Sequence, residues 1–427
     1  MAATSAEATG RPSAVTSSDV PRFLHAYAKP AAPATSFLTI TGGRGATVVD
    51  RDGKEYIDAL ASLWYCQAGH GRSEIVDAIV TQAQKLDTFH TFDRFTNEPA
   101  DALADRLSRL APMDDARVFL VSGGSEAVDT AMKLARLAHH LNGKPERTLV
   151  ISRTPSYHGV TFGGLSATGI AANQAGFGPL VSGVVQVPYD DLDAVDAVVE
   201  QHGGPSAVAA IVAEPVVGAG GVLPPPDGYL AGLRERADRY GAFLILDEVI
   251  CGFGRLGHWF GGSRYGVVPD LVTFAKGVTS GYQPVGGVLV GRRVREPLEA
   301  DGDYVLRHGN TYGGHPIACA AALANLDVLE QEDLCGRADA VGARLRDGLA
   351  PNVDGSRVLE VRGDGAVWAA RVDPAIGATP VRDGMLDLGV IARPLGADVV
   401  AFCPPLVITD AEVDRVAEVF SQVTSSF

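Results

Sequence analysis

Two residues that follow short apolar runs, Asp247 and Lys276, are the side chains of this sequence best suited to do chemistry. Asp247 ends the run Leu-Ile-Leu at 244–246, and Lys276 follows Thr-Phe-Ala at 273–275 in a chain with only six lysines. At the end of a buried strand an amine loses water, which lowers its pKa and makes it nucleophilic toward an aldehyde. A buried carboxylate needs a cationic partner, and such a pair is worth about 4 kcal/mol at roughly 4 Å and an effective dielectric constant of about 20. That is enough to keep a pyridine nitrogen protonated, so that its ring withdraws electrons.

A turn of small residues precedes both of them in the chain. Ser-Gly-Gly-Ser-Glu-Ala at 122–127 lies between a strand-like run and a helical pattern that continues to residue 141. Backbone N–H groups at a helix N-terminus can bind an anion, and small residues let a phosphate approach them. Taken singly, each of the three features has a commoner explanation: a capping box at the turn, a helix-capping aspartate and a solvent-exposed lysine.

A fourth motif points to a different class of enzyme. Glycines 252, 254 and 257 match G-x-G-x-x-G after an apolar run. A dinucleotide site also needs a helix that opens at the third glycine and an acidic residue about 20 positions later, and the sequence offers neither. A nicotinamide-dependent dehydrogenase is therefore a weaker alternative, and a binding protein without catalysis is another.

The elements that must position these residues alternate between apolar runs and helical patterns. Strands that are apolar on both faces and separated by helices predict an α/β fold with a mostly parallel sheet, and ligands of such sheets bind beyond the carboxyl ends of the strands. The predicted strands are 117–121, 148–152, 184–187, 209–213, 242–246, 271–274 and 285–290.

Both ends of the chain predict a smaller α+β domain beside the large one. The periodicity favours a strand at 46–50 and helices at 74–86, 97–110, 316–330 and 410–423. We expect a disordered tail over 1–20, the small domain over 21–75 and 311–427, and the large domain over 76–310.

Composition excludes several classes of protein. A net charge of −15 on 427 residues, without any Lys/Arg cluster, argues against nucleic-acid binding. No apolar run approaches the roughly 18 residues that a membrane span requires. The five scattered cysteines lack a C-x-x-C pair, which predicts free thiols in a reducing cytoplasm, and we expect no metal site.

Several motifs, in this order along the chain, make the sequence resemble the class III aminotransferases of the pyridoxal 5′-phosphate (PLP) fold type I. The resemblance covers the chain from about Tyr27 to its end. The matching motifs are the turn at 122–127, Tyr157-His158-Gly159, Glu214-Pro215, Leu246-Asp247-Glu248-Val249, Ala275-Lys276-Gly277 and Thr311-Tyr-Gly-Gly-His-Pro316.

The resemblance implies a role for each matching position. Lys276 carries PLP as a Schiff base and shuttles a proton, and Asp247 pairs with the pyridine nitrogen. Tyr157 and Val249 enclose the ring, and Glu214 braces the site. The remaining cofactor-binding positions are Gly124, Ser125 and His158, with Thr311 supplied by a neighbouring subunit, which implies a homodimer or higher oligomer.

The sequence departs from the family's pattern at two positions of the phosphate turn. Gly123 and Val128 stand where Ser or Thr and Asn are usual. Fewer side-chain hydrogen bonds then surround the phosphate, so we expect weaker affinity for the cofactor.

Further positions resemble the ω-amine:pyruvate group within this family. Leu63, Trp64 and Phe92 match its apolar substrate pocket, and Arg393 matches its mobile arginine. The group moves an amino group from a primary amine to pyruvate or a related keto acid by a ping-pong mechanism. Ala219 replaces the acidic gate of ornithine-type enzymes. A diaminopelargonate-type aminotransferase of the biotin pathway is the alternative, because Trp64 followed by Tyr65 is compatible with it.

Overall fold

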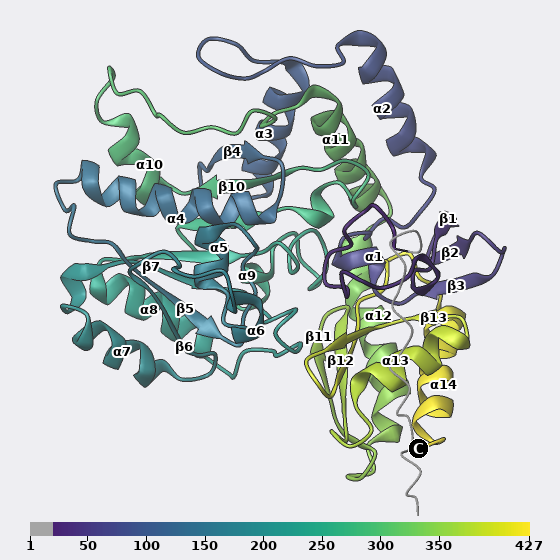
Figure 1. The fold of residues 1–427 in the computed structure, drawn as a ribbon. Helices are drawn as coiled ribbons and strands as arrows, with labels where there is room; N and C mark the ends of the chain where they lie inside the picture. The colour runs from purple at the N-terminus through teal and green to yellow at the C-terminus, as the bar shows by residue number, and fades with distance from the viewer. Residues whose placement is uncertain (1–19) are drawn as a thin grey trace, which may run out of the picture.

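A computed structural model describes residues 20–427, so all but the last residue of the predicted tail lies outside the described residues. Figure 1 shows a large α/β unit and, beside it, a separate unit built on smaller sheets. Among the described residues no helix is long and apolar enough to cross a membrane. All five cysteines are free thiols.

The large unit is built around a seven-stranded sheet. Each of the seven predicted runs forms a strand, with bounds within two residues of those expected. In spatial order the strands are β4 (Arg117–Val121), β10 (Gly286–Val290), β9 (Leu271–Phe274), β8 (Phe243–Asp247), β7 (Val208–Ala213), β5 (Leu149–Thr154) and β6 (Val184–Pro188). Strand β10 is antiparallel to both neighbours and the other pairs are parallel, which confirms the α/β prediction.

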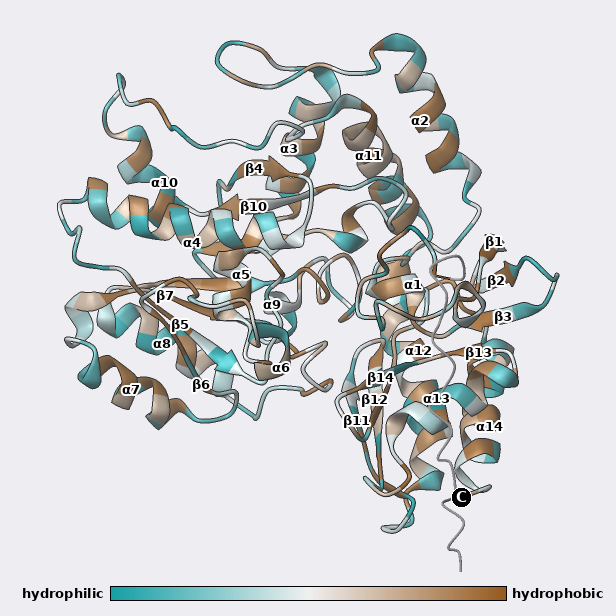
Figure 2. Cartoon of the chain, in the orientation of Figure 1, coloured by the Kyte–Doolittle hydropathy of each residue, from teal (hydrophilic) through white to brown (hydrophobic). Residues whose placement is uncertain are grey.

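Helices cover both faces of this sheet, which explains why its central strands are apolar throughout. One hydrophobic cluster joins α4 (Gly124–Leu141) and α10 (Arg292–Glu299) to the sheet, and another joins α7 (Leu192–Gln201) and α8 (Tyr229–Tyr240) to the opposite face. Figure 2 shows apolar colours along the strands and mixed colours on the covering helices. Shorter helices lie in the connections: α5 (Phe162–Ala167), α6 (Ala171–Gln174), α9 (Gly261–Arg264) and the 3-10 turns η2 (Pro205–Ala207) and η3 (Lys276–Val278).

Both chain ends contribute to one of the smaller sheets. Strand β13 (Val390–Ile391) pairs in parallel with β3 (Glu55–Asp58), which continues into β2 (Thr47–Asp50) and β1 (Ile40–Arg44). The second small sheet has the order β11 (Val358–Asp364), β12 (Val367–Val372), β15 (Val399–Phe402) and β14 (Arg393–Leu395). The neighbouring elements are η1 (Ala34–Ser36), α1 (Ala61–Trp64), α12 (Leu334–Leu349), η4 (Ala350–Asn352), α13 (Ala378–Asp387) and α14 (Asp410–Thr424).

Three further helices pack together at the edge of the large unit. Helix α11 (Pro316–Gln331) contacts both α2 (Ser73–Lys85) and α3 (Glu98–Leu110). The segment with the G-x-G-x-x-G match forms turns, and the next helix, α9, begins at Gly261 and has four residues. Because no helix opens at Gly257, the dinucleotide interpretation of this motif fails. The exact domain boundaries at 75 and 310 stay predictions.

Candidate active site

A cavity of about 500 Å³ lies at the carboxyl ends of β8 and β9, where the sequence predicts the ligand site. Of the thirteen residues that the sequence nominated, eleven line this cavity. They are Leu63, Trp64, Gly124, Ser125, Tyr157, His158, Glu214, Asp247, Val249, Lys276 and Arg393. Segments more than 300 residues apart in the chain thus meet at one edge of the sheet.

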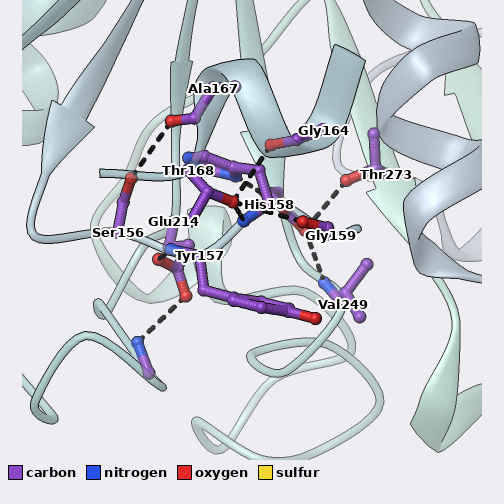
Figure 3. Close-up of polar contacts among 12 residues, drawn as sticks. Ser156, Tyr157, His158, Gly159, Gly164, Ala167, Thr168, Glu214, Val249 and Thr273 are labelled. Atoms are coloured by element: carbon purple, nitrogen blue, oxygen red, sulfur yellow. Dashed lines mark hydrogen bonds and ion pairs between the residues drawn. The ribbon is translucent and has the colours of Figure 1, made fainter. Parts of the chain in front are cut away.

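Asp247 ends β8 with its side chain almost completely buried. Its Oδ2 lies 2.7 Å from Nδ1 of His158, and its Oδ1 accepts hydrogen bonds from Thr273 Oγ1 at 3.0 Å and from the Val249 N–H at 3.2 Å. Figure 3 shows His158, Thr273 and Val249 gathered around this point. The helix-capping alternative fails, because these partners fix the carboxylate at the cavity instead of at a helix end.

Lys276 lies just beyond β9 and begins the 3-10 turn η3. Its backbone has φ of 47°, a conformation that costs a residue with a side chain about 1–3 kcal/mol and is common at functional sites. Burial lowers the pKa of its amine, while the nearby carboxylate of Asp247 opposes that shift. The amine therefore lies buried beside an acid and loses its proton more easily than a free lysine, so the alternative of a solvent-exposed lysine fails.

The N-terminus of α4 opens into the same cavity. Its N-cap residue is Gly123, which offers no side-chain acceptor, and Glu126 accepts instead from the Ser122 N–H at 2.8 Å. The capping-box alternative is thus wrong, and the first N–H groups of an 18-residue helix have no side-chain cap. A Cβ at Gly124 would lie 3.0 Å from Val249 Cγ1, so a larger residue here would crowd Val249. The arrangement suits a phosphate.

Glu214 fixes the backbone that carries Tyr157. Its carboxylate accepts hydrogen bonds from the Tyr157 N–H at 3.1 Å and the Gly218 N–H at 2.9 Å. Burial raises the pKa of Glu214, and burial also raises the pKa of the Tyr157 phenol. In Figure 3 the Tyr157 ring extends toward Val249 from the same side as Glu214. The ring is therefore a fixed, neutral wall of the cavity.

Arg393 faces the cavity from β14 of the second small sheet. Burial lowers the pKa of its guanidinium, and its Nε is buried without a hydrogen-bond partner. Among residues 20–427 no carboxylate forms an ion pair with it. An unpaired cation inside a largely apolar cavity can bind a carboxylate from a ligand.

The sequence reasoning missed further cavity residues, among them Tyr27, Ile170 and Asn173. Asn173 donates a weak hydrogen bond to the Tyr27 hydroxyl at 3.4 Å. Tyr27 also lies close enough to Tyr157 and Arg393 to affect the pKa of both. These residues belong to no motif, and only the fold brings them to the site.

Phe92 and Thr311 lie outside this cavity. Phe92 lines a second cavity of about 340 Å³ together with Gly309 and Asn310. The loop that carries it is attached there, because Thr91 Oγ1 donates a hydrogen bond to the Gly313 carbonyl at 2.8 Å. The expectation that Phe92 joins Leu63 and Trp64 is therefore not met within one chain. Thr311 is exposed to solvent in the described chain.

Comparison with known proteins identifies the family. The model of the family described as "Aminotransferase class-III" matches residues 27–424. The chain is a class III aminotransferase. It is 39% identical to a probable aminotransferase of Mycobacterium tuberculosis, with 90% of this chain and 89% of the relative covered. It is 36% identical to an omega-aminotransferase of Caulobacter vibrioides, with 87% and 90% covered.

Solved structures agree with this assignment. An amine transaminase from an uncultivated Pseudomonas species, solved in its PLP-bound form, is 36% identical to this aminotransferase. The two superpose with a TM-score of 0.91 over 95% of this chain and 99% of the other. The fold is that of PLP enzymes of fold type I, and PLP is the cofactor of the family. The aminotransferase has groups that fit this cofactor. They are an amine whose pKa is lowered, a buried carboxylate and a helix N-terminus without a side-chain cap.

Proposed function

We propose that this aminotransferase moves the amino group of a primary ω-amine to pyruvate or a related keto acid by a ping-pong mechanism. The observation that carries the proposal is the unpaired Arg393 in a cavity whose other wall is Leu63 and Trp64. An apolar wall favours the uncharged side of an amine, and a lone guanidinium favours a carboxylate. The relative from Caulobacter vibrioides, named an omega-aminotransferase, supports the same class.

Each residue expected to contact the PLP ring or its phosphate has a distinct task in this proposal. PLP, when bound, supplies the ring that accepts electrons from the substrate carbon. Lys276 holds the cofactor covalently, and its freed amine moves the proton at the substrate Cα. Asp247 keeps the proton on the ring nitrogen, and His158 orients Asp247. Tyr157 and Val249 confine the ring, while the Gly124 and Ser125 N–H groups hold the phosphate.

Donor and acceptor use one cavity in turn, which is why the mechanism is ping-pong. The donor amine lies against Leu63 and Trp64, and its ketone or aldehyde product leaves before the keto acid enters. The carboxylate of the keto acid then pairs with the fork-shaped guanidinium of Arg393. Tyr27 lines the same cavity near Arg393.

A donor screen tests the proposal directly. Purified enzyme with PLP is offered 1-phenylethylamine or putrescine with pyruvate, and alanine formation is measured. In parallel it is offered S-adenosylmethionine with 7-keto-8-aminopelargonate, and consumption of the keto acid is measured. We expect turnover with the first two. Turnover with S-adenosylmethionine alone, with 7-keto-8-aminopelargonate as acceptor, would contradict the proposal and favour the biotin-pathway alternative.

Arg393→Met is expected to weaken use of the keto acid selectively. Loss of a bidentate, charge-assisted pair of about 3 kcal/mol raises KM for pyruvate by roughly 100-fold. The half-reaction with 1-phenylethylamine stays within about threefold of wild type, because that donor has no carboxylate. The control is Arg382→Met, whose guanidinium bonds Asp383 at 2.6 Å and does not line the cavity. An equal loss in both half-reactions would argue against the assigned role.

We also propose that Thr311 completes the phosphate site of a second subunit, and that Phe92 reaches that subunit's substrate pocket. Neither residue lines the Lys276 cavity of its own chain. The segments that carry them are joined by the hydrogen bond from Thr91 Oγ1 to the Gly313 carbonyl. Thr311→Val removes one hydrogen bond to a charged group, worth about 1.5–3 kcal/mol. We expect PLP affinity to fall by roughly tenfold or more, measured by fluorescence titration, with kcat retained at saturating PLP. Unchanged PLP affinity would contradict the role.

A further inference from the structure

The segment that presents Leu63 and Trp64 to the cavity has an unusual backbone. Ala61 has φ of 49°, Ser62 has φ of 59° with ψ of −87°, and Trp64 has φ of 68°. Residues with a Cβ rarely adopt positive φ, and three such residues within four persist only where surrounding contacts hold them. This conformation exposes Leu63 to the cavity mouth while it buries Trp64.

A single buried carboxylate, that of Asp58, binds this segment. Its Oδ1 accepts a hydrogen bond from the Leu60 N–H at 3.1 Å, and its Oδ2 accepts one from the Ser62 N–H at 2.6 Å. Oδ2 also lies 2.8 Å from Nε2 of His70. Only 1% of Asp58 is exposed, so water cannot replace these contacts. The carboxylate thus joins both N–H groups that flank Ala61.

His70 is itself held by the turn between β1 and β2. Its backbone forms two hydrogen bonds with Gly45, N–H to carbonyl in each direction, at 2.9 and 3.0 Å. The imidazole therefore reaches Asp58 from a fixed point. Asp58 is in turn the last residue of β3, so the clamp of Asp58 and His70 is anchored on one strand and on the turn between β1 and β2.

The other side of the segment docks against the turn that follows Lys276. The Ser62 hydroxyl lies 2.5 Å from the Tyr65 hydroxyl, and the Tyr65 ring leaves no room for a Cβ at Gly281. The Ala68 N–H donates to Ser280 Oγ at 3.0 Å. Leu63 and Trp64 are consequently placed relative to Lys276 by the clamp on one side and by this contact on the other.

We propose that Asp58, oriented by His70, is a positioning residue that sets which amines the cavity accepts. The inference rests on the proposed function, in which Leu63 and Trp64 form the wall against the donor. Without the carboxylate, the Leu60 and Ser62 N–H groups lose their shared acceptor, and the strained backbone of 61–64 relaxes toward ordinary φ angles. Leu63 and Trp64 then leave the position from which they contact a bulky donor.

The test is amine selectivity in Asp58→Asn, which keeps the shape but replaces one acceptor oxygen with a donor that opposes the N–H groups. We measure kcat/KM for 1-phenylethylamine divided by that for isopropylamine, with pyruvate as acceptor. The expected result is a fall of tenfold or more in this ratio, because displacing an apolar wall changes discrimination by 10–200-fold. The visible absorption of the Lys276-bound cofactor should match wild type.

Asp50→Asn is the matched control. Asp50 is also buried in this region and accepts from the Asp52 and Lys54 N–H groups, both at 2.9 Å, but it lies outside the cavity. It should leave the ratio within twofold of wild type. A fall of similar size in Asp50→Asn would mean that general loosening, and not positioning, explains the effect.

His70→Phe keeps the test decisive if Asp58→Asn fails to fold. It removes the orienting N–H group and should lower the ratio in the same direction by a smaller factor. An unchanged ratio in folded Asp58→Asn and His70→Phe, together with an altered ratio in Leu63→Ala, would overturn the inference alone. An unchanged ratio in Leu63→Ala and Trp64→Ala would overturn the proposed pocket.

Discussion

Replacement of Lys276 by alanine is expected to lower kcat/KM for transamination by at least about 10³-fold. The variant loses the amine that holds the cofactor covalently and the group that moves the Cα proton, and general acid–base catalysis alone contributes roughly 10²–10⁴-fold. Alanine formation from pyruvate measures the loss. The absorption band of the Lys276-bound cofactor should vanish, although PLP can still bind through its phosphate.

Two further lysine variants make this result specific. Lys276→Arg keeps a positive charge but cannot form an imine, so it should be as inactive as alanine. Lys54→Ala removes a lysine that donates to the Asp387 carbonyl at 2.9 Å and does not line the cavity, and should retain wild-type activity. Substantial turnover in Lys276→Arg would show that the covalent link is dispensable.

The central sheet was predictable because its strands are buried on both faces. Strands β7, β8 and β9 consist of buried residues throughout, so their apolar runs stand out from the amphipathic helices between them. A charged residue at the end of such a run, as at Asp247, is conspicuous because burial makes it costly. Fold class and the reactive pair could therefore be predicted together.

Other parts of the site depend on contacts that no local pattern reveals. Tyr27 belongs to no motif and reaches the cavity through packing between distant segments. The turn at 122–127 contains Glu126 in a position typical of a capping box, yet Gly123 takes the N-cap. Phe92 and Thr311 matched family motifs, yet they lie outside the Lys276 cavity of their own chain, which no local pattern of the sequence could indicate.

The conformation of 61–64 could not be predicted for a related reason. Local propensity disfavours positive φ for Ala61, Ser62 and Trp64 alike. Hydrogen bonds from the Leu60 and Ser62 N–H groups to the buried carboxylate of Asp58, which lies outside every motif, stabilise it. Strain of this kind arises where tertiary contacts override the local preferences of the chain.

Asp247→Asn is expected to slow the amine half-reaction by roughly 10³-fold. A carboxylate at roughly 4 Å from the ring nitrogen stabilises its proton by about 4 kcal/mol, or about three pKa units, at an effective dielectric constant of about 20. Asparagine keeps the shape and the hydrogen bond from Thr273 but carries no charge. Stopped-flow absorbance after mixing with 1-phenylethylamine measures the rate.

The pH dependence of this variant gives the sharper test. Without the negative charge the ring nitrogen loses its proton at a lower pH, so the residual rate of Asp247→Asn should fall as pH rises, while the wild-type rate depends less on pH over the same range. Asp270→Asn is the matched control, because Asp270 is buried beside Arg234 and Arg293 at the amino end of β9. It should lower the melting temperature but leave the pH profile unchanged. A wild-type profile in Asp247→Asn would mean that another group holds the proton, and the pairing of Asp247 with the ring would have to be abandoned.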